Sequence, residues 1–300
     1  VRHRWIGLSL FLAALVFPLL LSGPWAELRL SPYKSLSQAL QVSGTRIEGV
    51  RSSPLGLLTV VESPRIPFRH APGLSIRSPF EPPEQLGVFT DGGALSVINR
   101  HDGRGPVPEY LDYLTSALPY HLLQKPSVLV LGSGGGSDVL LAAFHQARRI
   151  DAVEVNAQMV DLLEKDFAPF SGRPYNRRKV RVHIAEARGF TATGDQQYDL
   201  IQIALVDAFG AASAGLHALN ENYLYTLEAM EGFLARLAPG GLVAITRWLK
   251  LPPRDSLKLF ATAAQALGRS RVARPGRSLA LIRGFKTTTL LVKNGAFSQA

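Results

Sequence analysis

The sequence predicts an α/β protein built on a doubly wound, mostly parallel seven-stranded sheet that an antiparallel hairpin closes. From residue 128 onward, short apolar runs alternate with segments of helical pattern, which is typical of a parallel sheet with helices on both faces. The first of these runs leads into a glycine-rich loop. The last two runs, 279–283 and 288–293, have no helix between them, so we expect them to form the closing hairpin.

The composition is that of a folded chain. Its 300 residues are 46% hydrophobic and 19% charged, which excludes a disordered or collagen-like protein and fits two domains or one large domain with an appendage. The absence of cysteine excludes disulfides, thiolate metal sites and a cysteine nucleophile. The net charge of +10 favours an anionic partner, and nucleic acid, a nucleotide and an acidic membrane surface all fit that description.

The N-terminal segment has the pattern of a membrane helix. Residues 5–21 carry no charge, and Trp5 and Trp25 flank them as interfacial aromatic residues do in membrane proteins. We therefore expect residues 1–26 to contain a transmembrane helix, the last of a longer membrane region if the chain is a fragment, and a bacterial inner-membrane location. A secretory signal and a buried helix are the alternatives, although no good small-x-small cleavage site follows the apolar run.

A small β-rich region is expected over residues 27–108. Nine of the twenty prolines lie between residues 51 and 110, and this density excludes long helices. Asp91-Gly92-Gly93 has the composition of a hairpin turn. Strand-like runs occur at 57–62, 86–89 and 94–98.

Residues 109–300 are expected to form the main domain. The domain opens with a helical pattern at 109–123, which Lys125-Pro126 ends. The alternation then predicts strand 128–131, helix 137–146, strand 151–155, helix 157–167, strands 180–185 and 200–205, helix 221–237, strand 242–246 and helix 255–267.

The glycine loop carries the first chemical signal. Backbone N–H groups at the start of a helix bind anionic or polar ligand groups, and here the loop leads directly into a predicted helix. Glu154 ends the next strand, at the distance where a carboxylate can bind ribose hydroxyls. Loop and acid together predict a nucleoside-containing cofactor, while the absence of Gly-Lys-Ser/Thr argues against ATP hydrolysis. The loop glycines are Gly132, Gly134, Gly135 and Gly136.

Further candidates follow the third and fourth strands. Glu186 and Ala187 follow the third, where a carboxylate can accept a hydrogen bond from an adenine amino group, and Asp207 follows the fourth. The carboxyl ends of parallel strands share one edge of the sheet, where such folds bind their ligands. We therefore expect Glu186 and Ala187 to bind the cofactor and Asp207 to be the catalytic residue on the acceptor side.

Seven segments, together with the terminal hairpin, carry a family resemblance: SPLGLLTVVES at 53–63, FTDGG at 89–93, LTSALPYHLL at 114–123, VLVLGSGGG at 128–136, AVEVN at 152–156, YDLIQIALVDAFG at 198–210 and ENYLYTLEAMEGFLARLAPGG at 221–241. They resemble the spermidine/spermine synthase-like branch of the class I S-adenosylmethionine-dependent methyltransferase fold, in particular its membrane-linked bacterial members. The resemblance extends over roughly residues 31–293. It implies a transferase that uses S-adenosylmethionine or its decarboxylated form and a small-molecule acceptor, an amine in the polyamine-forming members.

Two departures from this family favour methyl transfer to an unknown small acceptor. The aminopropyltransferases carry an aspartate in the loop, where this chain has Gly135, and a D-x-x-D pair after the fourth strand, where it has Ala204 and Asp207. The first acid of that pair is the expected base for the amine, and losing a base costs about 10²- to 10⁴-fold in rate. Aminopropyl transfer in polyamine biosynthesis remains the alternative, because Asp138 or Asp112 could replace the lost acids.

The acceptor pocket is expected to be formed by Asp91, His121, Asp138 and Tyr223, with the Gly-, Ala- and Ser-rich stretch 207–219 as its gate. The histidines show no ligand pair at helical spacing, and methyl transfer from a sulfonium requires no metal. We therefore expect no metal site.

Two other functional classes stay open. A non-catalytic cofactor-binding module of a membrane protein would keep the fold without turnover, and a nicotinamide oxidoreductase would transfer a hydride. The five cations between Arg173 and Arg181 fit a solvated loop or a contact with anionic lipid, and no nucleic-acid partner is expected because no binding motif occurs. A homodimer is considered, and the catalytic domain is expected to face the cytoplasm.

Overall fold

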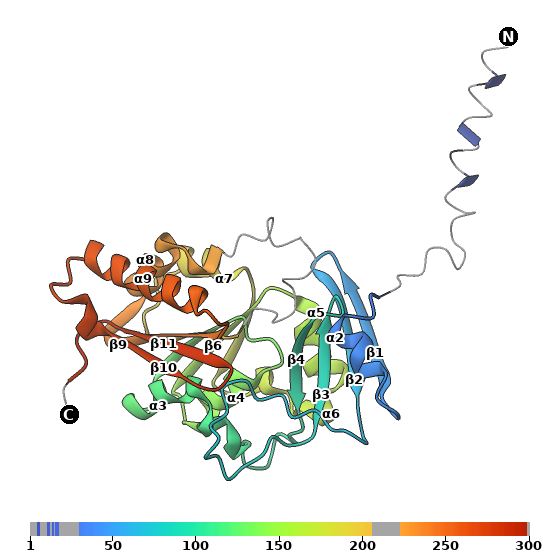
Figure 1. Ribbon diagram of the computed structural model, residues 1–300, viewed down its shortest axis with the longest axis horizontal. Coiled ribbons are helices and arrows are strands. Elements are labelled where there is room, and N and C mark those ends of the chain that lie inside the picture. Colours follow the sequence, from blue (N-terminus) through green and yellow to red (C-terminus); the bar gives the residue numbers. More distant parts are fainter. Residues whose placement is uncertain are drawn as a thin grey trace.

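The computed structural model describes residues 30–205 and 223–298, together with residues 5–6, 11–12, 14 and 16–17. The described chain forms two sheets, a four-stranded sheet from the N-terminal part and a seven-stranded sheet from the rest (Figure 1). The candidate site described below lies where the two sheets meet.

The seven-stranded sheet has the predicted architecture. Its order is β10-β11-β9-β8-β5-β6-β7, in which β9, β8, β5, β6 and β7 run parallel and β11 is antiparallel to both of its neighbours. The predicted mostly parallel sheet with a closing antiparallel hairpin is therefore confirmed. The strands are β5 (Ser127–Leu131), β6 (Arg149–Glu154), β7 (Val180–Ile184), β8 (Tyr198–Ile203), β9 (Leu237–Trp248), β10 (Leu279–Arg283) and β11 (Thr287–Lys293).

Alternate side chains of β5 enter two hydrophobic cores, one on each face of the sheet. Val128 and Val130 pack in one core and Leu129 and Leu131 in the other, as the two-residue period of a strand requires. Helix α4 belongs to the first core, and α8 and α9 belong to the second. The principal helices are α4 (Ser137–Phe144), α5 (Ala157–Asp161), α7 (Ala187–Thr193), α8 (Leu227–Ala235) and α9 (Arg254–Arg269).

The four-stranded sheet is an antiparallel meander in the order β1-β2-β3-β4. Its β3–β4 turn is the predicted hairpin, because Asp91 and Gly92 adopt left-handed φ values of 49° and 67° and Gly93 N donates to Thr90 O. Helix α2 packs beside this sheet through Leu36. The elements are α2 (Ser35–Leu40), β1 (Arg46–Ser53), β2 (Gly56–Glu62), β3 (Gln85–Thr90) and β4 (Ala94–Asn99).

The helix expected at 109–123 is instead three short pieces. Leu114 adopts an extended backbone and forms an isolated antiparallel bridge with Leu74, which interrupts the helix. The pieces are η2 (Glu109–Tyr113), η3 (Thr115–Ala117) and α3 (Leu118–Leu122). The remaining short elements are the π turn η4 (Leu162–Asp166), α6 (Ala168–Ser171), η5 (Pro174–Asn176), η8 (Tyr223–Tyr225) and η9 (Pro275–Ser278).

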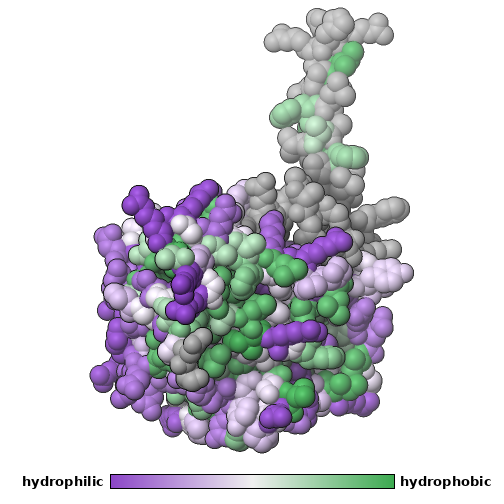
Figure 2. All heavy atoms as spheres, turned by 60° about the vertical axis from the view of Figure 1, so that its left-hand side comes forward, coloured by the Kyte–Doolittle hydropathy of each residue, from purple (hydrophilic) through white to green (hydrophobic). Residues whose placement is uncertain are grey.

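The surface on the side of the C-terminal hairpin mixes polar and apolar side chains. Figure 2, which brings this side forward, shows apolar groups toward the middle of this face and polar groups mainly around them. Leu251, Leu257 and Phe285 are exposed apolar residues of this part of the chain. Scattered exposed apolar residues are normal on a folded surface.

The predicted membrane segment is corrected. Most of residues 1–26 lie outside the described part of the chain, and those of residues 5–17 that are described are helical. Across the described residues, no helix combines the length and the apolar character that a bilayer crossing needs. This finding contradicts the expected transmembrane helix and inner-membrane location.

Candidate functional site

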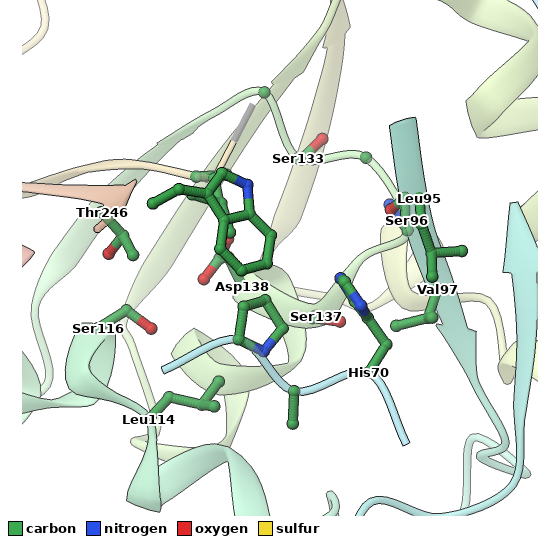
Figure 3. A pocket seen from close by; sticks show the side chains of 18 of the residues that line it. His70, Leu95, Ser96, Val97, Leu114, Ser116, Ser133, Ser137, Asp138 and Thr246 are labelled. Carbon is green, nitrogen blue, oxygen red and sulfur yellow. The ribbon is translucent and has the colours of Figure 1, made fainter. Parts of the chain in front are cut away.

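A cavity of about 130 Å³ lies between β4 and the carboxyl ends of the parallel strands. Figure 3 shows His70, Ser96 and Val97 on one side of it and Ser116 and Thr246 on the other. The glycine loop and the first residues of α4 also contribute to its lining. The cavity therefore opens at the sheet edge where the sequence predicts a ligand site.

The glycine loop owes its course to left-handed backbone positions. Gly132, Gly134 and Gly136 have φ values of 74°, 49° and 81°, which L-residues with side chains rarely adopt. Gly136 is the N-cap of α4, so the start of this eight-residue helix faces the cavity region. The loop is held on both sides, because Gly134 N donates to Glu154 Oε2 at 2.9 Å and Gly135 N donates to Ser96 Oγ at 3.2 Å.

Glu154 lies beside the loop, as the sequence predicts. The side chain is buried at the end of β6, and its second oxygen, Oε1, accepts from Asn156 N at 3.0 Å. Each carboxylate oxygen has more than one acceptor site, so both keep capacity for a further donor. The two backbone contacts fix the carboxylate in a single orientation, which suits it to bind a pair of ribose hydroxyls.

Gly135 has no room for a side chain. A Cβ atom at this position would lie 2.0 Å from Val97 O and 3.0 Å from Ser96 Oγ. Real Cβ atoms do not approach a backbone oxygen so closely. The aspartate that the resemblance places here is absent from the sequence, and β4 occupies the space it would need.

Asp138 supplies a carboxyl group to the cavity. It is the second residue of α4, and it is the acidic side chain among the described residues that line the cavity. Gln202 Nε2 donates to Asp138 Oδ1 at 2.5 Å, and Tyr120 Oη donates to Gln202 Oε1 at 2.6 Å. Burial raises the pKa of Asp138 to about 6, against the weaker opposite effect of the Gln202 hydrogen bond.

The aromatic hydroxyls around the cavity hold its walls. Tyr110 Oη donates to Asn99 Oδ1 at 2.9 Å, and Asn99 Nδ2 donates to Ser137 Oγ at 3.0 Å. Tyr175 Oη donates to Gly134 O at 2.6 Å. Burial raises the pKa of Tyr110 to about 12, so this hydroxyl stays protonated as a hydrogen-bond donor. These hydrogen bonds fix β4, α4 and the glycine loop relative to one another.

His70 faces the cavity and was not predicted as a site residue. Its ring contacts Trp248 edge to face, with ring centroids 6.4 Å apart (Figure 3 shows His70 at the cavity). Burial lowers the pKa of His70 to about 4, so the imidazole is neutral at neutral pH. The signal that could have identified it was weak, because His70 lies in an irregular segment before β3.

The residues predicted for the acceptor pocket do not converge. Asp91 is exposed in the β3–β4 turn, where its Oδ1 accepts from Leu57 N at 2.8 Å. His121 lies on α3 beside Asp112, outside the cavity. Tyr223 is exposed at the start of η8. Of the four predicted residues, the structure brings Asp138 to the cavity.

Two further predictions have different outcomes. Glu186 is the N-cap of α7, and its two oxygens accept from Arg188 N at 2.8 Å and Gly189 N at 2.6 Å. Ala187 is the first residue of that helix. The structure thus gives Glu186 a capping role. Asp207 and the predicted gate at 207–219 lie outside the described residues.

Comparison with known proteins identifies one domain. The spermine/spermidine synthase domain matches residues 114–248. A polyamine aminopropyltransferase of Lachnoclostridium phytofermentans is 32% identical over 145 residues, 46% of this chain and 50% of that protein. A polyamine aminopropyltransferase of Alkaliphilus oremlandii is 31% identical over 133 residues, 44% of each chain. The chain therefore spans about half the length of these curated relatives.

Solved structures share the fold. A probable spermidine synthase from Corynebacterium glutamicum superposes with a TM-score of 0.56 at 15% identity, covering 84% of this chain and 82% of that one. Spermidine synthase from Thermotoga maritima superposes with a TM-score of 0.54 at 12% identity, covering 84% and 74%. Residues 114–248 therefore match the spermine/spermidine synthase domain, and the chain is similar to polyamine aminopropyltransferases and shares the fold of solved spermidine synthases.

Proposed function

We propose that the chain is a transferase that moves the aminopropyl group of decarboxylated S-adenosylmethionine to a small amine. The observation that carries the proposal is the carboxyl group of Asp138 in the same cavity as the glycine loop. Two relatives of the chain are polyamine aminopropyltransferases, which supports this reaction over the methyl transfer that the sequence departures favour.

Charge explains why one acid matters here. The donor ammonium and the amine acceptor are both cationic, so an aminopropyltransferase pocket needs negative charge. The family resemblance predicts acidic residues at two positions where this chain has Gly135 and Ala204. Asp138 comes from the start of α4 and restores one carboxylate at the cavity.

The proposed role of Asp138 is to accept the proton that the acceptor must lose. An alkylammonium has a pKa of about 10 and becomes a nucleophile only after deprotonation. A carboxylate whose pKa is raised to about 6 is a stronger base than an ordinary aspartate. The sulfonium of the donor activates the adjacent carbon, so forming the C–N bond breaks the C–S bond and leaves the electron pair on sulfur. Glu154, beside the glycine loop, would hold the nucleoside part.

Activity is expected to fall as the pH decreases through about 6. Only the ionised form of Asp138 can take the proton, and burial places its pKa at about 6. The acidic limb of the kcat/KM profile, recorded with saturating donor, measures this pKa. An acidic limb near 4, the ordinary range of an aspartate, would contradict the assignment.

Replacement of Glu154 by alanine is expected to weaken binding of 5′-methylthioadenosine by about 10- to 100-fold, because hydrogen bonds to a charged acceptor contribute about 1.5–3 kcal/mol. The loss of its bond to Gly134 N would also loosen the loop. Calorimetric titration of the full chain measures the effect. Glu231→Ala is the matched control, since Glu231 makes an exposed ion pair with Arg269 on the surface. Equal affinity in Glu154→Ala and wild type would exclude Glu154 from the nucleoside site.

Methyl transfer from intact S-adenosylmethionine is the second candidate. It is favoured by the closed space at Gly135, because a loop without its aspartate does not repel the carboxylate of the intact donor. Titration with both donor forms separates the two candidates. Tighter binding of the decarboxylated donor supports aminopropyl transfer, and tighter binding of intact S-adenosylmethionine supports methyl transfer.

A further inference from the structure

Three possible metal ligands from distant parts of the sequence meet behind the candidate site. Asp112 belongs to η2, His121 belongs to α3, and His145 follows the last residue of α4. The Nε2 atoms of both histidines lie 2.8 Å from the same oxygen, Asp112 Oδ1. The three ligand atoms lie within 4.8 Å of one another, and no second cluster of this kind occurs in the described part of the chain.

Hydrogen bonding does not account for the whole cluster. His121 Nε2 forms a hydrogen bond with Asp112 Oδ1. His145 Nε2 is buried and equally close to that oxygen, but it does not approach it at the angle of a hydrogen bond. A buried polar nitrogen without a hydrogen bond costs free energy. A cation bound between the two imidazoles and the carboxylate would remove this cost.

The surrounding rings hold His145 in place. Its imidazole stacks on Tyr120 with centroids 4.9 Å apart and an interplanar angle of 12°. Phe144 and His121 contact it edge to face, at 5.2 Å and 5.0 Å between centroids. A ligand whose orientation is fixed by packing binds a metal with less loss of conformational freedom.

We propose that Asp112, His121 and His145 form a binding site for a divalent transition metal ion of the zinc type. Two imidazole nitrogens and one carboxylate oxygen are a ligand set that zinc accepts, and the chain has no thiolates to compete. Three protein ligands leave one tetrahedral position for water. Asp112 and His121 also line an open cavity, through which an ion and a water molecule can enter.

The proposed ion would have a structural role. It would join η2, α3 and the end of α4, which the chain otherwise connects through intervening segments. Asp112 and His121 do not line the cavity beside the glycine loop, and His145 lies at the opposite end of α4 from that loop. Tyr120 links the two regions, because it stacks on His145 and donates to Gln202, which donates to Asp138.

The sequence predicts no metal because the ligands lie nine and twenty-four residues apart, without helical spacing. Tertiary folding brings them together. The expected absence of a metal site is therefore replaced by this proposal.

The test is a zinc titration of the full 300-residue chain, prepared without a histidine tag and treated with a chelator. Competition against a chromophoric chelator is expected to show one Zn²⁺ per chain. His121→Gln and Asp112→Asn are each expected to weaken that binding by at least about tenfold, since even outer-shell changes at metal sites cost 10- to 100-fold. His121 is half exposed, so its replacement is not expected to disturb the fold.

His183→Gln is the matched control. His183 Nε2 also contacts a carboxylate, Asp151 Oδ1 at 3.0 Å, but it belongs to no three-ligand cluster among the described residues. Zn²⁺ is expected to raise the Tm of wild type and His183→Gln and to leave the Tm of His121→Gln unchanged. Absence of one-to-one binding to wild type, or binding that both ligand variants retain, would overturn the proposal.

Discussion

Asp138→Asn is expected to lower kcat/KM by about 10²- to 10⁴-fold, the usual contribution of a positioned base. Asparagine has nearly the same shape and can still accept the hydrogen bond from Gln202, so the cavity keeps its form. Binding of 5′-methylthioadenosine should change little, because Glu154, beside the glycine loop, holds the nucleoside in the proposal. The measurement is steady-state turnover of decarboxylated S-adenosylmethionine with an amine acceptor, combined with the binding titration.

The same change is expected to stabilise the fold at pH 7.5. Burial raises the pKa of Asp138 to about 6 from its ordinary 3.8, so the folded protein binds this proton more tightly than the unfolded chain. Stability therefore falls as the pH rises from about 4 to 6, and an uncharged asparagine avoids a cost of roughly 1 to 3 kcal/mol. Asp161→Asn, which removes an exposed partner of Lys165, is the control for the stability measurement.

The activity measurement has its own contradicting outcome. A kcat/KM of Asp138→Asn equal to that of wild type would remove Asp138 from the mechanism.

Gly135→Asp is expected to destabilise the protein by at least about 3 kcal/mol, at the upper end of the range for forcing atoms into a packed site. The change would restore the aspartate found in aminopropyltransferases, but its Cβ would lie 2.0 Å from Val97 O. The closest atom belongs to the backbone of β4, which cannot move away by a side-chain rotation. We expect a lower Tm and no gain in activity, measured by thermal unfolding and turnover.

Gly232→Ala provides the contrast for this prediction. Gly232 lies within α8, and no atom lies within 4 Å of the position its Cβ would take. Alanine is favoured over glycine inside a helix, so the Tm should stay the same or rise. A Gly135→Asp variant with wild-type stability and higher activity would contradict this prediction. It would show that the backbone of β4 can move and make room for the aspartate.

Most of the large sheet could be predicted because its strands are buried on both faces. Val128 to Leu131 form a continuous apolar run, and side chains from both faces enter hydrophobic cores. Strand β1 was missed because its side chains are mostly exposed and its sequence carries charges and a glycine. Helix α7 was missed because Gly189 and two threonines lower its helix propensity, and the Glu186 cap is what begins it.

The site was predictable only where its parts lie at regular positions in the sequence. The glycine loop and Glu154 could be predicted from the strand–loop–helix order of the fold. The hydrogen-bonded residues around Asp138 could not be predicted in this way. Gln202 and Tyr120 come from other elements, and Gln202 lies 64 residues from the acid it contacts. A polar residue inside the apolar strand β8 was the available signal for Gln202. Asp91 and His121 were expected in the acceptor pocket but lie outside the cavity, because the directions of their side chains depend on tertiary packing.

The most direct test of the account is to identify the products that the full chain makes from decarboxylated S-adenosylmethionine and putrescine. We expect spermidine and 5′-methylthioadenosine in equal amounts by mass spectrometry, and no such products from Asp138→Asn at the same protein concentration. A parallel reaction with intact S-adenosylmethionine should yield no transfer. Formation of S-adenosylhomocysteine and a methylated acceptor from the intact donor, without products from the decarboxylated one, would contradict the account.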